Sequence, residues 1–230
     1  MDNPGAVATA DRSVSTSAEP VVRLKATGIT KSYRRGILLR RREVPVLRGI
    51  DLVVGAGEVV GLVGENGSGK STLMKILVGA LAADRGQMNV SGRIGYCPQE
   101  PLLYDRLTCD EHLELFGVAY GMDTDAIKTA GASLYTTLGY ERWRTTRVEE
   151  LSGGTRAKLN LSIALLADPD LLLLDEPYAG FDWDTYERFW DLTAQLRDAG
   201  RSVLVISHFV NDQERFDRIV ELREGRIVAQ

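Results

Sequence analysis

The sequence has few of the residues that would cross-link it, hold a zinc ion or carry it through a membrane. Its 2 cysteines, Cys97 and Cys109, rule out a disulfide framework and fit a reducing compartment. Neither cysteine lies in a CxxC or another metal-ligand spacing, so no structural zinc site is expected. The longest mostly apolar run, 76–83, is far shorter than the roughly 18 to 20 residues of a membrane-spanning helix. The first twenty residues lack a basic start followed by an apolar block, so we expect no secretory signal and a cytoplasmic location.

The charge balance gives no support for a nucleic-acid-binding protein. The chain has 28 Lys and Arg against 32 Asp and Glu, a formal net charge of -4, and 44% hydrophobic residues, which is a globular composition. No basic face with interleaved aromatic residues stands out, and no nucleic-acid partner is expected. Residues 1–20 are rich in Ala, Ser, Thr and Pro without periodic apolar positions. We therefore expect a disordered leader over 1–20 and a single domain over 21–230.

Strands and helices are predicted to alternate along the chain. Short β-type runs bounded by turn residues cover 22–25, 44–54, 58–63, 86–90, 93–97, 171–174 and 202–206. Helical patterns cover 70–78, 108–146, 152–167 and 184–197, and a hairpin is predicted over 218–228. This order predicts an α/β fold with a largely parallel sheet and helices on both faces. In such sheets ligands bind at the carboxyl ends of the strands.

A phosphate-binding loop is predicted between the run 58–63 and the helix 70–78. Its residues are Gly64, Glu65, Asn66, Gly67, Ser68, Gly69, Lys70, Ser71 and Thr72. This segment matches the phosphate-loop pattern, which requires a strand before it and a helix after it. Glycines let the backbone N–H groups of 67–70 converge on phosphate oxygens, aided by the positive end of the helix dipole. Lys70 is then expected to reach the β- and γ-phosphates, and Ser71 to ligate Mg²⁺.

A second catalytic segment follows the apolar run 171–174. Asp175 is placed to emerge from a buried strand beside the phosphate loop and to hold Mg²⁺. Glu176 is then placed to polarise the attacking water, and this general-base assistance is typically worth about a hundredfold to ten-thousandfold in rate. Together with the phosphate loop, the pair indicates a nucleotide triphosphatase.

A third motif narrows the class of nucleotide triphosphatase. It consists of Leu151, Ser152, Gly153, Gly154 and Thr155. With this motif the chain resembles the ATP-binding-cassette (ABC) ATPases, whose signature is LSGGQ, although Thr155 takes the place of the glutamine. Physically, Ser152 can cap the following helix while the two glycines let a phosphate approach bare backbone N–H groups. The resemblance implies that this second anion site faces the γ-phosphate of ATP bound to the opposite subunit, so that two chains enclose two ATP molecules.

The resemblance extends to further positions in the correct order. It implies that Tyr33 stacks on adenine and that Gln99 reaches Mg²⁺ and the water and senses the γ-phosphate. Asp182 occupies the place of a loop that contacts the second subunit, although Trp183 replaces the proline often found next. His208, at the end of the run 202–206, resembles a switch histidine that contacts the γ-phosphate.

Two single residues are given a non-catalytic interpretation. The chain has only 2 histidines, and the second, His112, is expected on the surface of the helical insert. Cys97, two residues before Gln99, is either redox-sensitive or simply a buried thiol, of which the buried thiol is the commoner case.

The resemblance covers about 21–230 and implies the ABC ATPase fold. This fold is a P-loop nucleotide triphosphatase core with a largely parallel sheet flanked by helices, an antiparallel β subdomain and an inserted helical subdomain, here at about 100–150. The resemblance also implies that the chain binds ATP and Mg²⁺ and hydrolyses ATP to ADP and phosphate.

The resemblance to this family also implies that the chain works together with other protein subunits. A single cassette needs a second ATP-binding subunit, identical or different. Most such chains drive separate transmembrane permease subunits, which dock over the groove after Gln99, here including 100–104, at the inner face of the cell membrane. The stretches 101–108 and 111–117 look like those of drug, antibiotic and polysaccharide or lipid exporters, which favours export over import. The alternative is a soluble ABC scaffold that acts on a non-membrane partner, as in cofactor assembly.

The motifs assign no role to one basic segment of the chain. Residues 31–42 hold six basic residues and no acidic one. This segment is either a solvated hairpin loop or a contact with anionic headgroups or an acidic membrane partner.

Overall fold

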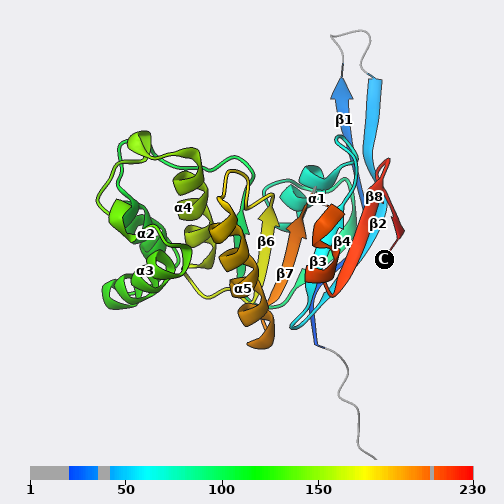
Figure 1. The fold of residues 1–230 in the computed structure, drawn as a ribbon. Coiled ribbons are helices and arrows are strands. Elements are labelled where there is room, and N and C mark those ends of the chain that lie inside the picture. The colour runs from blue at the N-terminus through cyan, green and yellow to red at the C-terminus, as the bar shows by residue number, and fades with distance from the viewer. Residues whose placement is uncertain (1–20, 36–41, 208–209, 230) are drawn as a thin grey trace, which may run out of the picture.

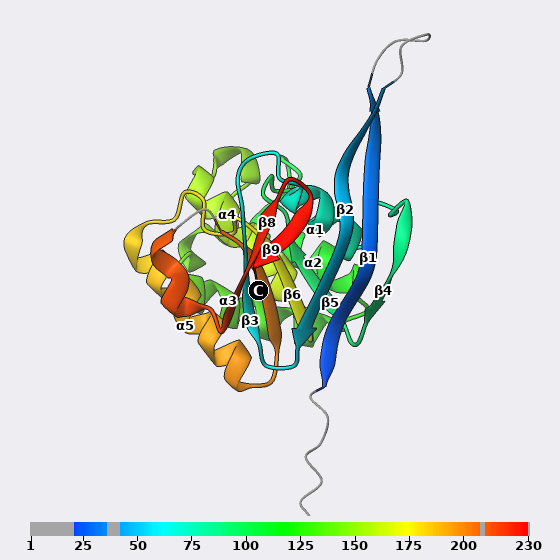
Figure 2. The same cartoon turned by 90° about the vertical axis from the view of Figure 1, so that its right-hand side faces the viewer.

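The computed structural model describes residues 21–35, 42–207 and 210–229, in which two sheets pack around one short helix. The larger sheet has the order β5-β6-β7-β3-β8-β9, and only β9 runs antiparallel to its neighbour. Its strands are β3 (Val59–Val63), β5 (Ile94–Cys97), β6 (Leu171–Asp175), β7 (Ser202–Ile206), β8 (Arg218–Arg223) and β9 (Arg226–Ala229). The smaller sheet is antiparallel with the order β2-β1-β4, formed by β1 (Val22–Arg35), β2 (Arg42–Gly55) and β4 (Arg85–Val90). β1 and β2 form a long ribbon that projects beyond the rest of the molecule (Figure 2).

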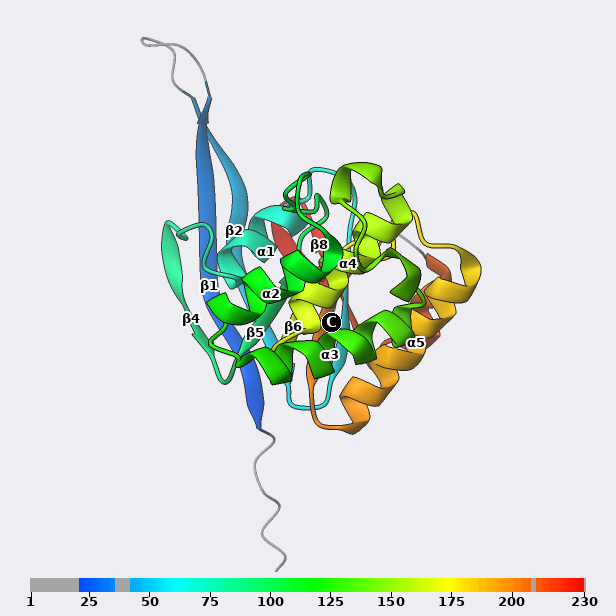
Figure 3. The same ribbon diagram turned by 90° about the vertical axis from the view of Figure 1, so that its left-hand side faces the viewer.

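Helices occupy both faces of the larger sheet, as the alternation of elements predicts. They are α1 (Lys70–Leu77), α2 (Cys109–Ala119), α3 (Thr124–Leu138), α4 (Gly153–Leu165) and α5 (Trp183–Asp198), with 3-10 turns at Glu141–Trp143, Val148–Glu150 and Val210–Arg215. α1 lies between the two sheets, whereas α4 and α5 cover the opposite face and α2 and α3 stack outside them (Figures 1 and 3). Among the described residues, none of the helices combines the length and apolarity needed to cross a membrane.

The buried strand β6 shows why the run of leucines is continuous rather than alternating. Leu171 and Leu173 pack into the core that contains α1 and the antiparallel sheet. Leu172 and Leu174 point to the other core, formed with α4 and α5. A parallel strand covered on both faces must be apolar at every position, so period-2 alternation is absent. The expected α/β fold with a largely parallel sheet, flanking helices, an antiparallel β part and a helical insert is confirmed.

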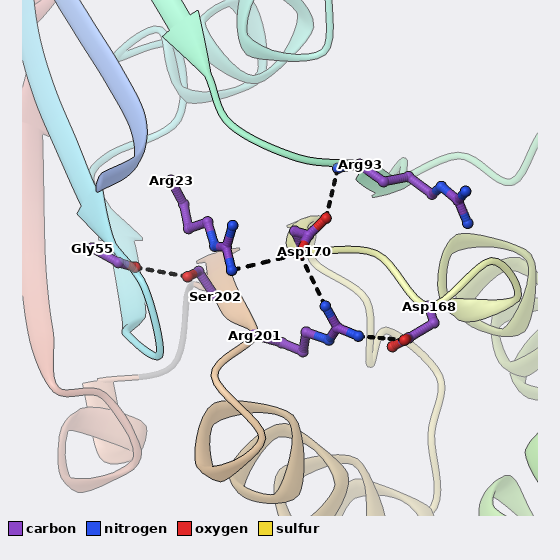
Figure 4. A network of polar contacts seen from close by, with 7 residues as sticks. All are labelled: Arg23, Gly55, Arg93, Asp168, Asp170, Arg201 and Ser202. Carbon is purple, nitrogen blue, oxygen red and sulfur yellow. Dashed lines mark hydrogen bonds and ion pairs between the residues drawn. The ribbon is translucent and has the colours of Figure 1, made fainter. Parts of the chain in front are cut away.

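A polar cluster ties strands together at the amino ends of the larger sheet. The Asp170 carboxylate accepts hydrogen bonds from the Arg93 backbone N–H (2.9 Å) and from Nη1 of Arg201 (2.9 Å), and it lies 3.5 Å from Nη2 of Arg23. Arg201 also pairs with Asp168. Figure 4 shows the side chains of Arg23, Arg201 and Asp168 and the backbone N–H of Arg93 around Asp170, at the starts of β5, β6 and β7. This cluster fixes the amino ends, and the loops at the carboxyl ends remain available for a ligand.

Two expectations require correction. The strand predicted at 22–25 extends to Arg35, because β1 pairs with β2 along its length and with β4 as far as Thr30, while a register shift between Ala26 and Ile29 interrupts the alternation of its buried side chains. His112, predicted on the surface, is buried: Nδ1 lies 2.8 Å from the Thr108 carbonyl oxygen, and the Tyr104 N–H donates to Nε2 at 2.9 Å. Burial lowers the pKa of His112, so a neutral ring that donates from Nδ1 and accepts at Nε2 satisfies both contacts.

Candidate functional site

The phosphate loop connects β3 to α1 through a backbone that only glycine can adopt at two positions. Gly64 has φ 151° and Gly69 has φ 113°. A Cβ on Gly64 would lie 2.1 Å from the carbonyl oxygen of Leu222, and one on Gly69 would lie 2.8 Å from Cδ2 of Leu47. Any larger residue would push the loop away from the β8 side of the sheet and from β2. The curl that turns N–H groups toward one point therefore depends on these glycines.

Lys70 begins α1 and holds the loop closed from inside. Its ammonium donates to the carbonyl oxygens of Gly64 (2.7 Å) and Glu65 (3.1 Å). Burial lowers the pKa of Lys70, while the negative charges of Glu176 and Asp175 act in the opposite direction. A buried cation that donates to carbonyl oxygens is well placed to exchange them for the stronger attraction of phosphate oxygens.

Asp175 and Ser71 form an oxygen-donor pair at the end of β6. Asp175 is 3% exposed, and its Oδ1 is buried with no hydrogen-bond partner among the described residues. Burial, followed by the charge of Glu176, raises the pKa of Asp175, and a hydrogen bond from the Ser71 side chain partly offsets this shift. An unsatisfied buried carboxylate oxygen beside a hydroxyl fits Mg²⁺, which prefers hard oxygen ligands. The described residues contain no cluster of three His, Cys, Asp or Glu that could hold a metal alone, so phosphate and water oxygens would complete its shell.

Glu176 adopts a backbone conformation that is unusual for a residue with a side chain. Its φ is 51°, and its N–H donates to the Ile206 carbonyl oxygen at 3.2 Å, which joins the ends of β6 and β7. A positive φ costs about 1 kcal/mol or more for a non-glycine residue and is often found at functional sites. The conformation turns the half-buried carboxylate into the cavity rather than along the strand.

Several predicted site residues line one cavity of about 370 Å³ at the carboxyl ends of the strands. They are Tyr33, Asn66, Gly67, Gly69, Lys70, Ser71, Thr72, Gln99 and Glu176, together with Val46. Tyr33 also borders an adjoining cavity of about 690 Å³ that includes Arg34, Arg48 and Glu224. Tyr33 is thus 40% exposed at the junction of the two cavities, where its ring is accessible to a planar ligand.

Ser68, in the phosphate loop, is a buried residue. The Ser68 hydroxyl is buried with no hydrogen-bond partner among the described residues, whereas its carbonyl oxygen accepts the Gly225 N–H at 3.1 Å. His208 lies outside the described residues, as do the leader 1–20 and the centre of the basic stretch, 36–41.

The signature motif is located away from this cavity. Ser152 caps α4 by accepting the Thr155 N–H at 3.3 Å, and its Oγ lies 2.9 Å from Oγ1 of Thr155. Thr155 is therefore turned inward, where it is 8% exposed, and Leu151 is buried in the core. No residue of 151–155 is among the described residues that line the 370 Å³ cavity.

The two signature glycines have different surroundings. A Cβ on Gly153 would meet no atom within 4 Å, so the space beside this exposed residue is open. A Cβ on Gly154 would lie 2.5 Å from the carbonyl oxygen of Gly180, in the loop before α5. Gly153 leaves room for an external anion, while Gly154 is required for internal packing.

Asp182 and Trp183 form the start of α5. The Asp182 carboxylate caps the helix by accepting the Thr185 N–H at 2.8 Å. Hydrogen bonds from the Thr185 side chain and then from its N–H lower the pKa of Asp182. Nζ of Lys158, on α4, lies 4.0 Å from Asp182. Trp183 is 71% exposed and stacks on Tyr186 with ring centroids 5.6 Å apart.

Two polar residues near the site escaped the sequence analysis. The Tyr178 hydroxyl lies in a buried contact with Ser207, donating at 2.6 Å, between the ends of β6 and β7. Asn160 on α4 donates to the carbonyl oxygen of Pro98 at 2.8 Å, next to Gln99. Asn160 is a polar residue between Leu159 and Leu161, and this is the signal that could have identified it, whereas Tyr178 follows the charged pair 175–176 and carries no such signal. Cys97 is a fully buried thiol whose pKa is raised by burial, which favours the structural interpretation over the redox one.

Comparison with known proteins identifies the family to which the chain belongs. The family described as "ABC transporter" matches residues 47–179. The chain is 34% identical over 226 residues to the Nod factor export ATP-binding protein I of Rhizobium meliloti (strain 1021), covering 93% of this chain and 65% of that protein. It is 31% identical over 219 residues to the linearmycin resistance ATP-binding protein LnrL of Bacillus subtilis (strain 168), covering 90% and 68%. The chain thus spans about 65% of the length of the first of these relatives.

Solved structures give the same fold. A dimeric ATP-binding cassette in a post-hydrolysis state, bound to ADP and Pi, superposes with a TM-score of 0.82 at 25% identity, over 89% of this chain and 96% of that one. An ATP-binding subunit of an ABC transporter superposes with a TM-score of 0.79 at 27% identity, over 90% and 88%.

Proposed function

Since the chain belongs to the ABC transporter family, we propose that it is an ATP-hydrolysing subunit that dimerises around two ATP molecules and drives separate membrane subunits. The observation that carries this proposal is the convergence of Lys70, Ser71, Gln99 and Glu176 on one cavity at the carboxyl ends of the strands. A cation, a metal-binding hydroxyl, an amide and a general base in one cavity are the groups that phosphoryl transfer to water requires.

Each residue has a role that its surroundings support. The loop N–H groups and Lys70 bind the phosphates, and Ser71 and Asp175 hold Mg²⁺ through oxygen atoms. When bound, Mg²⁺ neutralises phosphate charge and fixes the geometry of the reacting groups. Glu176 accepts a proton from the attacking water, and Gln99 orients that water. Tyr33 stacks on the adenine ring. His208 lies outside the described residues, and its contact with the γ-phosphate is proposed from the family resemblance alone.

The second subunit is required because one chain presents only half of each site. Residues 151–155 lie outside the cavity that holds the phosphate loop, and the open side of Gly153 can receive an anion only from another molecule. The positive end of α4 then faces the γ-phosphate bound by the opposite chain, and Asp182 contributes to the contact between subunits.

Export through a membrane partner is supported by the relatives and by one surface. The similar proteins named above are an export ATP-binding protein and a resistance ATP-binding protein. After Gln99 the chain presents two apolar side chains, Leu102 (75% exposed) and Tyr104 (58% exposed), on the segment where membrane subunits are expected to dock. A contiguous patch of exposed apolar side chains is typical of an interaction surface, and these two exposed residues, two positions apart in the chain, would contribute to such a patch. This placement corresponds to a peripheral position on the inner face of the cell membrane.

The experiment that tests the proposal combines hydrolysis with recovery of partners. Purified wild-type chain should release phosphate from ATP only with Mg²⁺. A tagged Glu176→Gln chain should then be recovered from native membranes in mild detergent with ATP, and its companions identified by mass spectrometry. Lys70→Ala, which should not bind ATP, is the matched control.

The possible results of this experiment distinguish the transport role, the scaffold role and a chain without ATPase activity. A multi-span protein in stoichiometric amount, recovered with Glu176→Gln but not with Lys70→Ala, supports the transport role. Soluble companions alone, with no dependence on detergent, support the scaffold instead. No Mg²⁺-dependent hydrolysis in the wild-type chain contradicts the enzymatic assignment.

A further inference from the structure

The helix that begins with the signature motif carries a buried amide that reaches the segment before Gln99. Asn160 lies on α4 and is 7% exposed. Its Nδ2 donates to the carbonyl oxygen of Pro98 at 2.8 Å and to Sγ of Cys97 at 3.2 Å. Because a carbonyl oxygen can only accept, the atom that faces Pro98 must be the amide nitrogen. The bridge therefore has a defined direction, from α4 to the end of β5.

The hydrogen bond from Asn160 to the Pro98 carbonyl oxygen is important because proline has no backbone N–H. Pro98 has no N–H, so its carbonyl is the only backbone polar group through which the structure can hold this residue. The next residue is Gln99, which lines the 370 Å³ cavity. A hydrogen bond on the preceding carbonyl fixes the peptide plane that joins Pro98 to Gln99, since the carbonyl and the next N–H are coplanar.

The surrounding packing makes α4 and β5 a single unit. A Cβ on Gly95 would lie 2.1 Å from the carbonyl oxygen of Ala164, so the strand and the helix approach more closely than any side chain would permit. Asn160 lies eight residues after Ser152, about 12 Å along the axis at 1.5 Å per residue. One helix thus connects the signature cap at its start to the Gln99 segment in its middle.

We propose that Asn160 is a positioning residue that holds Gln99 in the ATP cavity through the Pro98 carbonyl and so ties it to the signature helix. This inference rests on the proposed ATP hydrolysis. Asn160 touches neither nucleotide nor Mg²⁺ and acts only through Gln99. Without its N–H donors, the peptide before Gln99 can rotate, and the glutamine amide loses its fixed distance from the metal and the water.

The test compares two buried polar residues on the same helix. Asn160→Leu keeps a similar volume but removes both donors. Ser162→Ala is the matched control, because Ser162 is 0% exposed and its Oγ accepts from the Tyr140 hydroxyl at 2.6 Å, away from Gln99. For the full chain, kcat, KM for ATP, the Mg²⁺ concentration at half-maximal rate and Tm are measured.

We expect both variants to lower Tm, because each removes a buried hydrogen bond. Only Asn160→Leu should lower kcat about tenfold and raise the Mg²⁺ requirement while KM for ATP changes less than twofold. Equal kinetics for Asn160→Leu and Ser162→Ala would overturn the proposal, whereas a wild-type chain without hydrolysis would overturn the proposed function instead.

A double-mutant cycle separates positioning from general damage. If Asn160 acts through Gln99, Asn160→Leu should change kcat less than twofold in a Gln99→Ala background. Two effects that multiply would contradict this dependence. Asn160→Asp, which keeps the shape but cannot donate, provides a second variant if the leucine variant does not fold, and a wild-type rate for it would also contradict the proposal.

Discussion

At the scale of single residues, the site combines two neighbouring carboxylates that have different surroundings. Asp175 is buried beside Ser71, and burial raises its pKa. Glu176 is half-buried, lines the cavity and has a φ of 51°. The buried carboxylate is suited to hold a cation, and the more accessible one to take a proton from water.

Replacing Glu176 by Gln should separate hydrolysis from binding. The amide keeps the size of the side chain but cannot accept the proton, so kcat should fall by about 100-fold to 10,000-fold, while ATP affinity stays within about threefold. Phosphate release and equilibrium binding of a fluorescent ATP analogue measure the two effects. Glu114→Gln, on the exposed side of α2, is the control and should behave as the wild type. A normal rate for Glu176→Gln would remove this residue from the chemistry.

Replacing Asp175 by Asn should stabilise the chain in the absence of Mg²⁺. Because the pKa of Asp175 is raised above its ordinary value of 3.8, the folded state binds more protons than the unfolded state in the window above 3.8. The contribution of this carboxyl to stability is therefore lost as pH rises through that window, and at neutral pH the buried charge is a cost.

The Asp175→Asn variant, which carries a neutral amide, should accordingly melt a few degrees higher than the wild type at pH 7 in EDTA. It should also lose the rise in Tm that Mg²⁺ with ATP gives the wild type. Thermal unfolding with and without Mg²⁺-ATP measures both. An Asp175→Asn chain that melts lower in EDTA would show that the carboxylate is stabilised by contacts rather than strained by burial.

At the scale of elements, the start of α4 is held against the loop before α5. Gly154→Ala would place Cβ 2.5 Å from the Gly180 carbonyl oxygen, whereas Gly153→Ala would meet nothing within 4 Å. Overpacking of this kind typically costs about 1–3 kcal/mol, and alanine within a helix otherwise gains up to about 1 kcal/mol over glycine. We therefore expect Gly154→Ala to lower Tm and Gly153→Ala to keep or raise it. Similar melting of the two variants would contradict this close approach.

The start of α2 should be sensitive to pH through His112. Since burial lowers the pKa of His112, with Glu111 opposing this shift, the unfolded state takes up a proton first as pH falls. The stability contributed by the neutral ring is present above about 6.5 and is lost as pH falls below it. Protonation of Nε2 also removes the acceptor of the Tyr104 N–H.

We expect the wild-type chain to lose more Tm between pH 7 and pH 5.5 than His112→Gln, whose side chain does not titrate. Amide exchange at Tyr104 should accelerate over the same range in the wild type. An identical pH dependence for the two chains would show that His112 stays unprotonated throughout or does not support this segment.

The elements also show what could be predicted from residues and what could not. The strand at 171–174 was predictable because covering on both faces demands apolar side chains, and the phosphate loop because its glycines and Lys70 have few other uses. The strand β1 beyond Lys25 was not, because a register shift breaks the alternation between the buried Ala26 and Ile29, and the residues after Thr30 are held by backbone pairing with β2. His112 was misplaced and Asn160 was missed because the residue type alone does not show whether a polar side chain finds buried partners. His112 finds them in the turn just before it, at Tyr104 and Thr108, and Asn160 finds its partner at Pro98, far away in the sequence.

At the scale of the whole molecule, the two ends of the larger sheet differ in role. The amino ends of its strands carry stabilising ion pairs, and the carboxyl ends carry the candidate site. The ion pairs around Asp170 join the amino ends (Figure 4). The cavity of about 370 Å³ lies at the carboxyl ends. The signature at the start of α4 lies outside that cavity. On the proposed function, the chain holds one half of each of two sites, and a complete site requires two chains in an isologous arrangement that buries the same surface on both.

ATP should therefore convert a hydrolysis-deficient chain from monomer to dimer. The Glu176→Gln chain with Mg²⁺-ATP should scatter light as a particle of about twice 25.3 kDa, and as 25.3 kDa without nucleotide. Adding Ser152→Arg should keep ATP binding but prevent pairing, because a long cation replaces the cap that orients the start of α4 toward the opposite γ-phosphate. Ser133→Arg, on the exposed side of α3, is the matched control and should still pair. Pairing of the Ser152→Arg chain at the same ATP concentration would show that the signature does not face the second nucleotide.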